Sequence, residues 1–190
     1  MKPTVRRVSG ALLLSHAAGI RAVHADAFAA PPWHEDGTQA DLYLERLADD
    51  VRRPGFVAAL AFDGETVRGF ATAWTTPPVF PAGRCYPQVA AALGPRRTTE
   101  WLCGGREVDE LAVASAAHRS GTGAALLKTV TTDAPDGRCW LLTSVQPEGP
   151  LRFYRTHGWR QATHPAPDGT GYAAFLGPGH PARTEAATSL

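Results

Sequence analysis

The sequence has few cysteines and lacks any long apolar run. Its three cysteines, Cys85, Cys103 and Cys139, are odd in number, widely spaced and without a CxxC pair. This usage argues against a disulfide framework and a zinc site, and it favours a reducing, cytoplasmic location. The apolar run ALLL near the N-terminus is too short for a signal peptide or a membrane span. We therefore expect a soluble protein with no metal and no membrane partner.

A strong charge of either sign is also missing. The chain carries 19 basic and 18 acidic residues, a net charge of +1, so no bulk field attracts nucleic acid. Its 190 residues suffice for one domain with a sizeable core. We predict a single domain over residues 1–178 and a flexible tail over 179–190. The segment 75–100, rich in Pro and Gly, is either a surface excursion or a lid over a ligand.

Apolar spacing along the chain predicts alternating strands and helices. Strands are expected over residues 5–14, 107–113, 138–145 and 171–176, and a hairpin through Asp63-Gly64. Helices are expected over residues 19–28, 41–52 and 150–158, and after a glycine loop near residue 120. This mixture indicates an α+β fold whose sheet is partly antiparallel, with helices on its faces.

The glycine loop, HRSGTG at residues 118–123, joins the strand over 107–113 to a helix. Glycines at 121 and 123 let the backbone approach a ligand closely, and the N–H groups and dipole at the helix start favour an anion such as phosphate. The P-loop pattern is absent, and Leu126 stands where a dinucleotide fingerprint needs its third glycine. On the glycines alone, a tight turn without a ligand remains the alternative.

Two stretches of the chain resemble motifs of a known family, and this resemblance favours a ligand-binding loop over a simple turn. The stretch VDELAVASAAHRSGTGAALL resembles motif A of the GNAT superfamily of acyl-CoA-dependent N-acetyltransferases, with His118 standing where the family has Gln or Arg. The stretch LRFYRTHGW resembles motif B, with Tyr154, Gly158 and Trp159 in register, although QPEGP replaces the Asn often found upstream. The resemblance covers residues 5–176. It implies the GNAT fold, an α+β fold with a central, mostly antiparallel mixed sheet that is splayed in the middle and has helices on both faces.

The resemblance also implies a cosubstrate and its contacts. It implies that acetyl-CoA donates an acetyl group to a primary amine by direct attack in a ternary complex. The pantetheine arm is expected to pair with the backbone of Leu111, Ala112 and Val113. The pyrophosphate is expected on the motif A loop, which comprises His118, Arg119, Ser120, Gly121, Thr122, Gly123 and Ala124.

Direct attack needs a base for the ammonium and an acid for the departing thiolate. Tyr154 matches the family's tyrosine and is the expected acid. For the base, EVDEL offers Glu107, Asp109 and Glu110; related enzymes place an acid at the Glu110 or Glu107 position, and we rank Glu110 first and Glu107 second. The alternative is that these carboxylates are solvated or contact a cationic substrate.

The acceptor is expected to be a small-molecule amine, lined by Trp33, the 75–100 segment and Trp101. A protein N-terminus or a lysine side chain is the alternative acceptor. A non-catalytic acyl-CoA-binding module is a third reading, kept open by the departures at His118 and at residues 146–150. The sequence leaves homodimerisation through an edge strand open.

Overall fold

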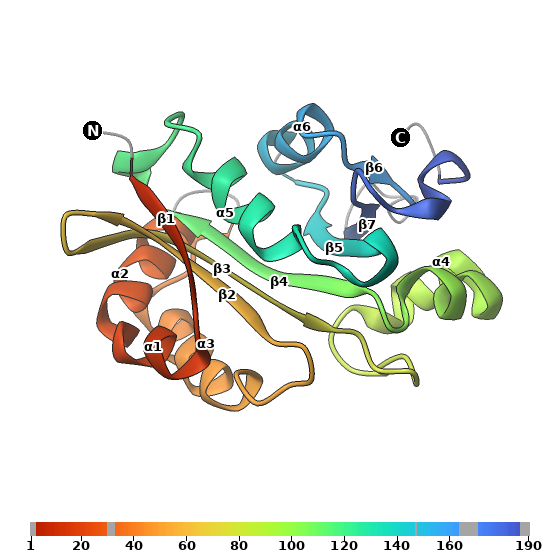
Figure 1. The fold of residues 1–190 in the computed structure, drawn as a ribbon, viewed down its shortest axis with the longest axis horizontal. Helices are drawn as coiled ribbons and strands as arrows, with labels where there is room; N and C mark the ends of the chain where they lie inside the picture. Colours follow the sequence, from red (N-terminus) through yellow and green to blue (C-terminus); the bar gives the residue numbers. More distant parts are fainter. Residues whose placement is uncertain (1–2, 30–32, 147, 164–170, 187–190) are drawn as a thin grey trace. The chain divides into compact units, whose positions relative to one another are not determined.

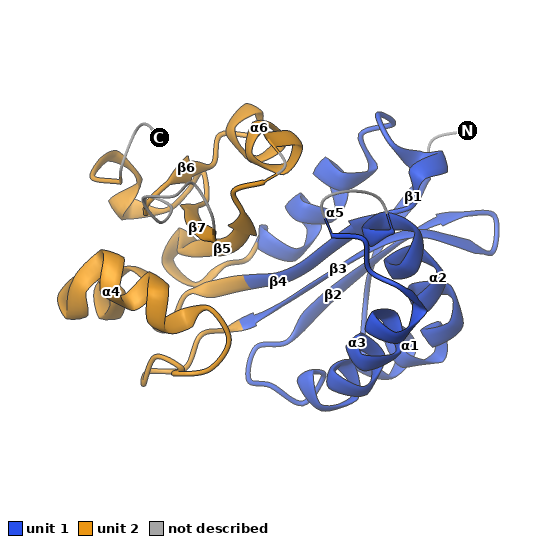
Figure 2. Cartoon of the chain, turned by 180° about the vertical axis from the view of Figure 1, so that it is seen from behind, with its two compact units in different colours: residues 1–74, 108–132 blue, residues 75–107, 133–190 orange. Residues whose placement is uncertain are grey.

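A computed structural model describes residues 3–29, 33–146, 148–163 and 171–186. The chain forms two compact units, shown in Figure 2: unit 1 comprises residues 1–74 and 108–132, and unit 2 comprises residues 75–107 and 133–190. Each unit has its own cluster of buried apolar side chains. Residues 187–190 of the predicted tail and Pro147 of the QPEGP stretch lie outside the described residues.

The strands of unit 1 are β1 (Thr4–Val8), β2 (Val57–Asp63), and most of β3 (Thr66–Thr75) and β4 (Arg106–Val113), in that spatial order. β2 pairs with β1 and with β3 in antiparallel register. The predicted hairpin through Asp63-Gly64 is confirmed, and Gly64 has φ +60°, a conformation that a residue without Cβ adopts readily.

Helices cover both faces of the unit 1 strands. α1 (Gly10–Ser15), α2 (Ala17–Phe28) and α3 (Gly37–Asp50) lie on one face, and α5 (Thr122–Thr131) lies on the other, as Figure 1 shows. Three apolar residues of α5, Leu126, Leu127 and Val130, are at most 3% exposed. A Cβ at Gly69 of β3 would lie 3.0 Å from Leu126 Cδ1, so this glycine allows α5 to pack closely against the sheet.

The strand predicted over residues 5–14 is wrong beyond Val8, because the chain turns there into α1. Ser9 caps this helix, and its Oγ accepts a hydrogen bond from the Leu12 amide at 3.2 Å. A short apolar run has no distinct period, and ALLL therefore did not reveal the helix. α3 also begins four residues before the predicted start, since Asp36 caps it by accepting from Thr38 N at 2.9 Å.

Unit 2 contains β5 (Cys139–Ser144), β6 (Arg160–Gln161) and β7 (Tyr172–Leu176), with β7 antiparallel to both of the others. Its helices are α4 (Tyr86–Arg97), which a π-helical turn over Thr98–Leu102 follows, and α6 (Glu148–Thr156). The two-residue β6 carries too little pattern to be predicted. The elements expected over 138–145, 150–158 and 171–176 are confirmed.

The 75–100 segment contributes to the core of unit 2. Tyr86, Val89 and Leu93 of α4 are at most 7% exposed and belong to a cluster with Trp140 and Leu176. Residues 180–186, part of the segment predicted as a tail, also pack on this unit: His180 is 4% exposed, and its Nε2 lies 2.9 Å from the Trp101 carbonyl oxygen. That the 75–100 segment acts as a lid over a ligand remains a prediction.

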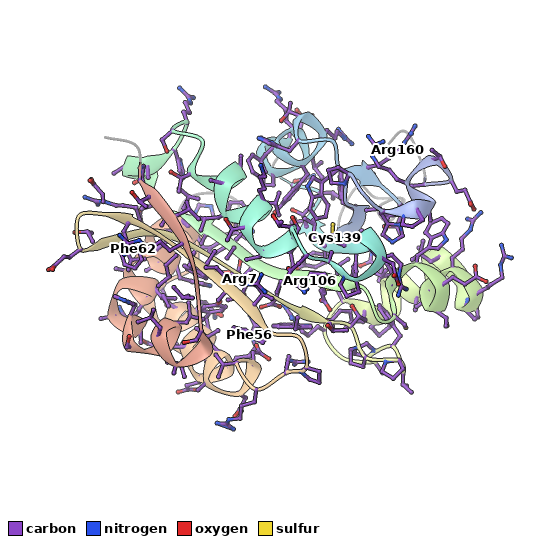
Figure 3. The ribbon with its side chains drawn as sticks, in the orientation of Figure 1. Arg7, Phe56, Phe62, Arg106, Cys139 and Arg160 are labelled. Carbon is purple, nitrogen blue, oxygen red and sulfur yellow. The ribbon has the colours of Figure 1, made fainter. Side chains whose placement is uncertain are left out.

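The three cysteines are free thiols in unit 2. Burial raises the pKa of Cys139, labelled in Figure 3, to about 11, so this thiol stays protonated and acts as a packing residue. No helix among the described residues is long and apolar enough to cross a membrane. The described residues form seven strands, and β1 with β2, β2 with β3, β5 with β7, and β6 with β7 are antiparallel. Together with the helices, these strands confirm the predicted α+β fold class.

Candidate active site

The loop between β4 and α5 in unit 1 has the backbone conformation of an anion cradle. Gly121 precedes α5 in the left-handed region, with φ +80°, and no side chain of the described residues caps the helix there. Arg119 is also left-handed, with φ +59°, which costs a residue with a Cβ about 1 kcal/mol. The first turn of α5 thus leaves its backbone N–H groups to another partner. This geometry fits the pyrophosphate that the sequence predicts for residues 118–124.

Side chains hold the loop in this shape. Asp26 of α2 reaches the 3₁₀ turn over Ser115–Ala117, where its Oδ2 accepts from Ser115 N at 2.6 Å and its Oδ1 from Ser115 Oγ at 3.1 Å. Ser120 Oγ donates to the Ala117 carbonyl at 2.7 Å and lies 2.6 Å from Thr122 Oγ1. Asp26 could not be identified from the sequence, because its partner is 89 positions away and no local pattern connects the two.

The end of β4 presents its backbone alternately to two sides. The Ala114 amide donates to the Arg68 carbonyl of β3 at 2.9 Å, and a Cβ at Gly69 would lie 3.0 Å from the Ala112 carbonyl oxygen. Since successive residues of a strand direct their N–H and C=O groups to opposite sides, Leu111 and Val113 present theirs away from β3. Of the predicted pantetheine contacts, these two are the ones with suitably directed groups.

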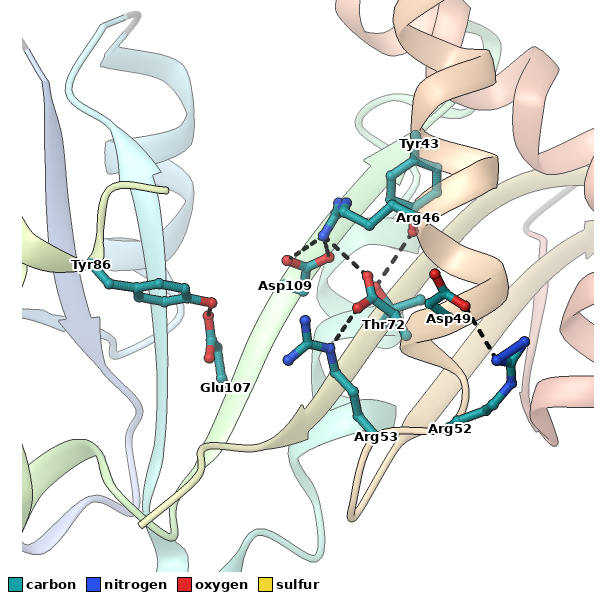
Figure 4. A network of polar contacts seen from close by, with 10 residues as sticks. Tyr43, Arg46, Asp49, Arg52, Arg53, Thr72, Tyr86, Glu107 and Asp109 are labelled. Carbon is teal, nitrogen blue, oxygen red and sulfur yellow. Dashed lines mark hydrogen bonds and ion pairs between the residues drawn. The ribbon is translucent and has the colours of Figure 1, made fainter. Parts of the chain in front are cut away.

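Asp109 is held by an arginine and is poorly suited to act as a base. Its side chain is 2% exposed, and its two oxygens accept from Arg46 Nη1 of α3 at 2.9 and 3.0 Å (Figure 4). The same Nη1 lies 3.2 Å from Asp50 Oδ2. The carboxylate is therefore buried and engaged by a guanidinium, so it is not placed to meet a substrate. The sequence had placed Asp109 among three candidates, and the structure gives it a role in tying α3 to β4.

Glu110 is half-buried in unit 1. Tyr43 of α3, 4% exposed, has a pKa raised well above its usual value, first by burial and then by the negative charges of Glu110 and Asp109. The Glu110 carboxylate is therefore close enough to the Tyr43 hydroxyl to disfavour its ionised form.

An aromatic cluster in unit 1 contains Trp33, one of the residues predicted to line the acceptor. Trp33 packs edge-on against Phe28 at 5.4 Å, Phe28 lies 4.6 Å from the His24 ring, and His24 stacks on Tyr43 at 4.8 Å. Burial, with a smaller effect of the Arg46 charge, lowers the pKa of His24 to about 4. The ring is therefore neutral at pH 7, although His24 Nδ1 lies 4.0 Å from a Glu35 oxygen.

Glu107 lies in unit 2 and has a neutral hydrogen-bond donor. It is 3% exposed, and the Tyr86 hydroxyl of α4 donates to its Oε1 at 2.6 Å (Figure 4). Tyr86 is 5% exposed and packs with Phe80 and Trp140. Glu107 was a candidate from the sequence. Its partner Tyr86 could not be identified there, because Tyr86 lies in the segment 75–100, whose Pro and Gly residues obscure any pattern.

Tyr154, the predicted acid, lies in α6 of unit 2 and is 9% exposed. Its ring packs against Phe175 of β7 and Trp159, each 6.0 Å away between ring centroids. Gly158, with φ +80°, ends the turn after α6, and the Trp159 amide donates to the Tyr154 carbonyl at 3.0 Å. Trp101 is 5% exposed in the same unit and belongs to its core cluster.

The predicted site residues thus divide between the units. Glu110 and both predicted cofactor segments lie in unit 1, and Glu107 and Tyr154 lie in unit 2. Each set is held by its own network: Asp26 and Ser120 brace the loop of unit 1, and Tyr86 contacts Glu107 in unit 2.

Comparison with protein families gives an independent result. A model described as the acetyltransferase (GNAT) family matches residues 20–159, which span both of the motifs identified in the sequence. No curated protein sequence matches the chain significantly.

Solved structures share the fold. A putative acetyltransferase of the GNAT family from Desulfovibrio desulfuricans is 21% identical, with a TM-score of 0.59 over 92% of this chain and 96% of that chain. PaiA N-acetyltransferase from Thermoplasma acidophilum, solved in complex with coenzyme A, is 14% identical, with a TM-score of 0.59 over 93% and 99%. A ribosomal-protein-alanine N-acetyltransferase from Brucella melitensis is 15% identical, with a TM-score of 0.53 over 91% and 98%.

Proposed function

Because the chain belongs to the GNAT acetyltransferase family and is an acyltransferase of that family, we propose that it transfers the acetyl group of acetyl-CoA to a primary amine of a small molecule. The amine attacks the thioester directly in a ternary complex. The observation that carries this proposal is the braced loop before α5, with a left-handed Gly121 at a helix start that no described side chain caps. Such a helix start binds a diphosphate through backbone N–H groups.

The cosubstrate contacts follow from the backbone directions in unit 1. The pyrophosphate accepts hydrogen bonds from the N–H groups of residues 118–124. The pantetheine arm pairs with β4 through the outward-directed N–H and C=O groups of Leu111 and Val113, in the manner of an added strand. Acetyl-CoA supplies the thioester carbonyl that the amine attacks, and the protein supplies its orientation.

Glu110 is the proposed general base. An amine in water at pH 7 is largely ammonium and must lose a proton before it can attack. Glu110 is next to Leu111 in β4 and half-buried, so it adjoins the proposed pantetheine contacts. Glu107 is the second candidate, because the Tyr86 hydroxyl orients its carboxylate without supplying a positive charge.

Tyr154 is the proposed general acid. The departing thiolate, with a reference pKa of about 8.5, leaves more readily when an acid protonates it. A tyrosine with a reference pKa of about 10 is protonated at pH 7 and can donate. The packing of Tyr154 against Phe175 and Trp159 holds its ring in one orientation, which supports this role.

The first test is thermal unfolding with acetyl-CoA, CoA, NAD and ATP. A ligand at about 100 times its dissociation constant stabilises the folded state by about 2.7 kcal/mol. Acetyl-CoA and CoA should therefore raise the unfolding temperature, and the controls NAD and ATP should not. A shift with none of the four ligands would contradict the proposal.

The second test is a panel of small amines and short peptides, assayed for acetyl transfer. Glu110→Gln and Tyr154→Phe should each lower kcat about 10²- to 10⁴-fold while CoA still raises the unfolding temperature. Glu107→Gln is the matched comparison, and a larger loss in it than in Glu110→Gln would assign the base to Glu107. Activity on peptides alone would replace the small-molecule acceptor, and activity on neither class with intact CoA binding would indicate a binding module.

A further inference from the structure

His118 makes a hydrogen bond that the sequence did not predict. Its Nε2 lies 3.0 Å from the carbonyl oxygen of Val113, the last residue of β4. A carbonyl oxygen only accepts, so Nε2 carries the proton and donates. The side chain of His118 is exposed. The ring therefore reaches back from the motif A loop to the strand that precedes it.

The carbonyl that it contacts is on the outward side of β4. The Ala114 amide donates to Arg68 of β3, and the alternation of the strand directs the Val113 carbonyl the opposite way. This is the same carbonyl that the proposed function assigns to the pantetheine arm. An amide N–H of the arm and the Nε2–H of His118 would thus donate to the same acceptor, the Val113 carbonyl oxygen.

We propose that His118 is a latch that competes with the pantetheine arm for the Val113 carbonyl. The inference rests on the proposed function, because it requires an arm that pairs with β4. In the conformation described, the ring satisfies the carbonyl. When coenzyme A binds, the ring leaves and the arm's amide N–H takes its place. His118 thereby lowers the affinity for any ligand that carries the arm and leaves unchanged the affinity for a nucleotide without it.

Hydrogen bonds that do not involve the His118 ring hold the loop, which is what distinguishes a latch from a brace. Asp26 holds Ser115 through two hydrogen bonds, and Ser120 contacts both Ala117 and Thr122. None of these contacts involves His118. Removal of the ring should therefore leave the pyrophosphate cradle intact.

The test is isothermal titration of two ligands into three proteins. The ligands are CoA and 3'-phosphoadenosine 5'-diphosphate, which has the same nucleotide and diphosphate but lacks the arm. The proteins are the wild type, His118→Ala and His118→Gln. His118→Gln keeps an N–H donor on the side chain and serves as the rescue variant.

His118→Ala should bind CoA about 3- to 10-fold more tightly than the wild type, the ratio expected for loss of one competing hydrogen bond. Its affinity for the truncated nucleotide should not change, and His118→Gln should return CoA binding toward the wild-type value. The unfolding temperature of ligand-free His118→Ala should fall only slightly, because the ligand-free fold loses the same single hydrogen bond.

Two results would overturn the latch. If His118→Ala lowered the affinity for both ligands equally, His118 would brace the loop or contact the pyrophosphate directly. Unchanged binding of CoA would show that the ring and the arm do not compete. These results leave the proposed function standing, because CoA still binds; a wild-type protein that binds neither ligand would instead refute the proposed function and the latch with it.

Discussion

Units 1 and 2 hold their buried carboxylates by different means. In unit 1, Asp109 and Asp50 share the guanidinium of Arg46. In unit 2, Glu107 accepts from a phenol, Tyr86. A guanidinium holds a carboxylate through a charge pair as well as hydrogen bonds, whereas the hydroxyl of a tyrosine contributes a hydrogen bond from an uncharged donor. Unit 1 thus uses a charge pair to tie α3 to β4, and two acidic residues of the same strand, Asp109 and Glu107, have different kinds of hydrogen-bond donor.

The largest expected effect comes from breaking the charge pair of unit 1. Asp109→Asn removes the anion from a side chain that is 2% exposed and should lower the free energy of unfolding by about 3 kcal/mol, measured by urea denaturation at pH 7. The control is Asp49→Asn, whose side chain is 83% exposed and pairs with Arg52; its effect should stay below about 0.5 kcal/mol. Equal losses would contradict a structural role for the Arg46–Asp109 pair.

His24, a buried neutral histidine of unit 1, makes the stability of the protein depend on pH. The pKa of His24 is about 4 in the folded chain, whereas that of a histidine side chain in water is 6.5. Between these values the unfolded chain binds a proton that the folded chain does not, so stability present above pH 6.5 is lost as pH falls toward 4. His24→Phe removes this term, and the drop in unfolding free energy from pH 7 to pH 4.5 should shrink by about 2 kcal/mol.

Urea denaturation at the two pH values measures this change. His157→Gln, at an exposed histidine after α6, is the control and should leave the pH-dependent loss as large as in the wild type. If His24→Phe and the wild type lost equal stability on acidification, the ring would not be held neutral by burial.

The neutral hydrogen bond of unit 2 should contribute less than the charge pair. Tyr86→Phe removes the hydroxyl that donates to Glu107 at 2.6 Å and should lower the unfolding free energy by about 1.5 kcal/mol. Tyr43→Phe is the matched variant in unit 1, where the hydroxyl lies 3.5 Å from Thr72 Oγ1; such a long contact should be nearly neutral. A larger loss in Tyr43→Phe would reverse this ranking of the two tyrosines.

The smallest effect is expected from an exposed charge pair of unit 1. Arg21 donates to both oxygens of Asp41, and this hydrogen bond holds the pKa of Asp41 below its usual value. Water and salt screen such a pair, so Asp41→Asn should leave the midpoint of thermal unfolding unchanged at 0.15 M salt. A clear drop would mean that charge pairs stabilise unit 1 irrespective of burial.

Local patterns sufficed for much of the fold. The spacing of Ile20 and Val23 identified α2, and the Asp63-Gly64 turn identified the hairpin, because each of these signals acts over a few neighbouring residues. The strand predicted over residues 5–14 failed at Ser9, where a side-chain cap started a helix inside an apolar run. The core role of α4 was not predicted, since the Pro and Gly around it conceal which of its residues meet Trp140.

By itself the sequence determined the family, the glycine loop and the candidate carboxylates, because motifs A and B are contiguous stretches whose spacing survives without coordinates. Only the tertiary structure decided which carboxylate has which partner. Arg46 meets Asp109 across 63 positions, and Tyr86 meets Glu107 across 21. Partners so far apart come together only when helices and strands pack, and the protonation chemistry of a carboxylate depends on the partner that it then meets.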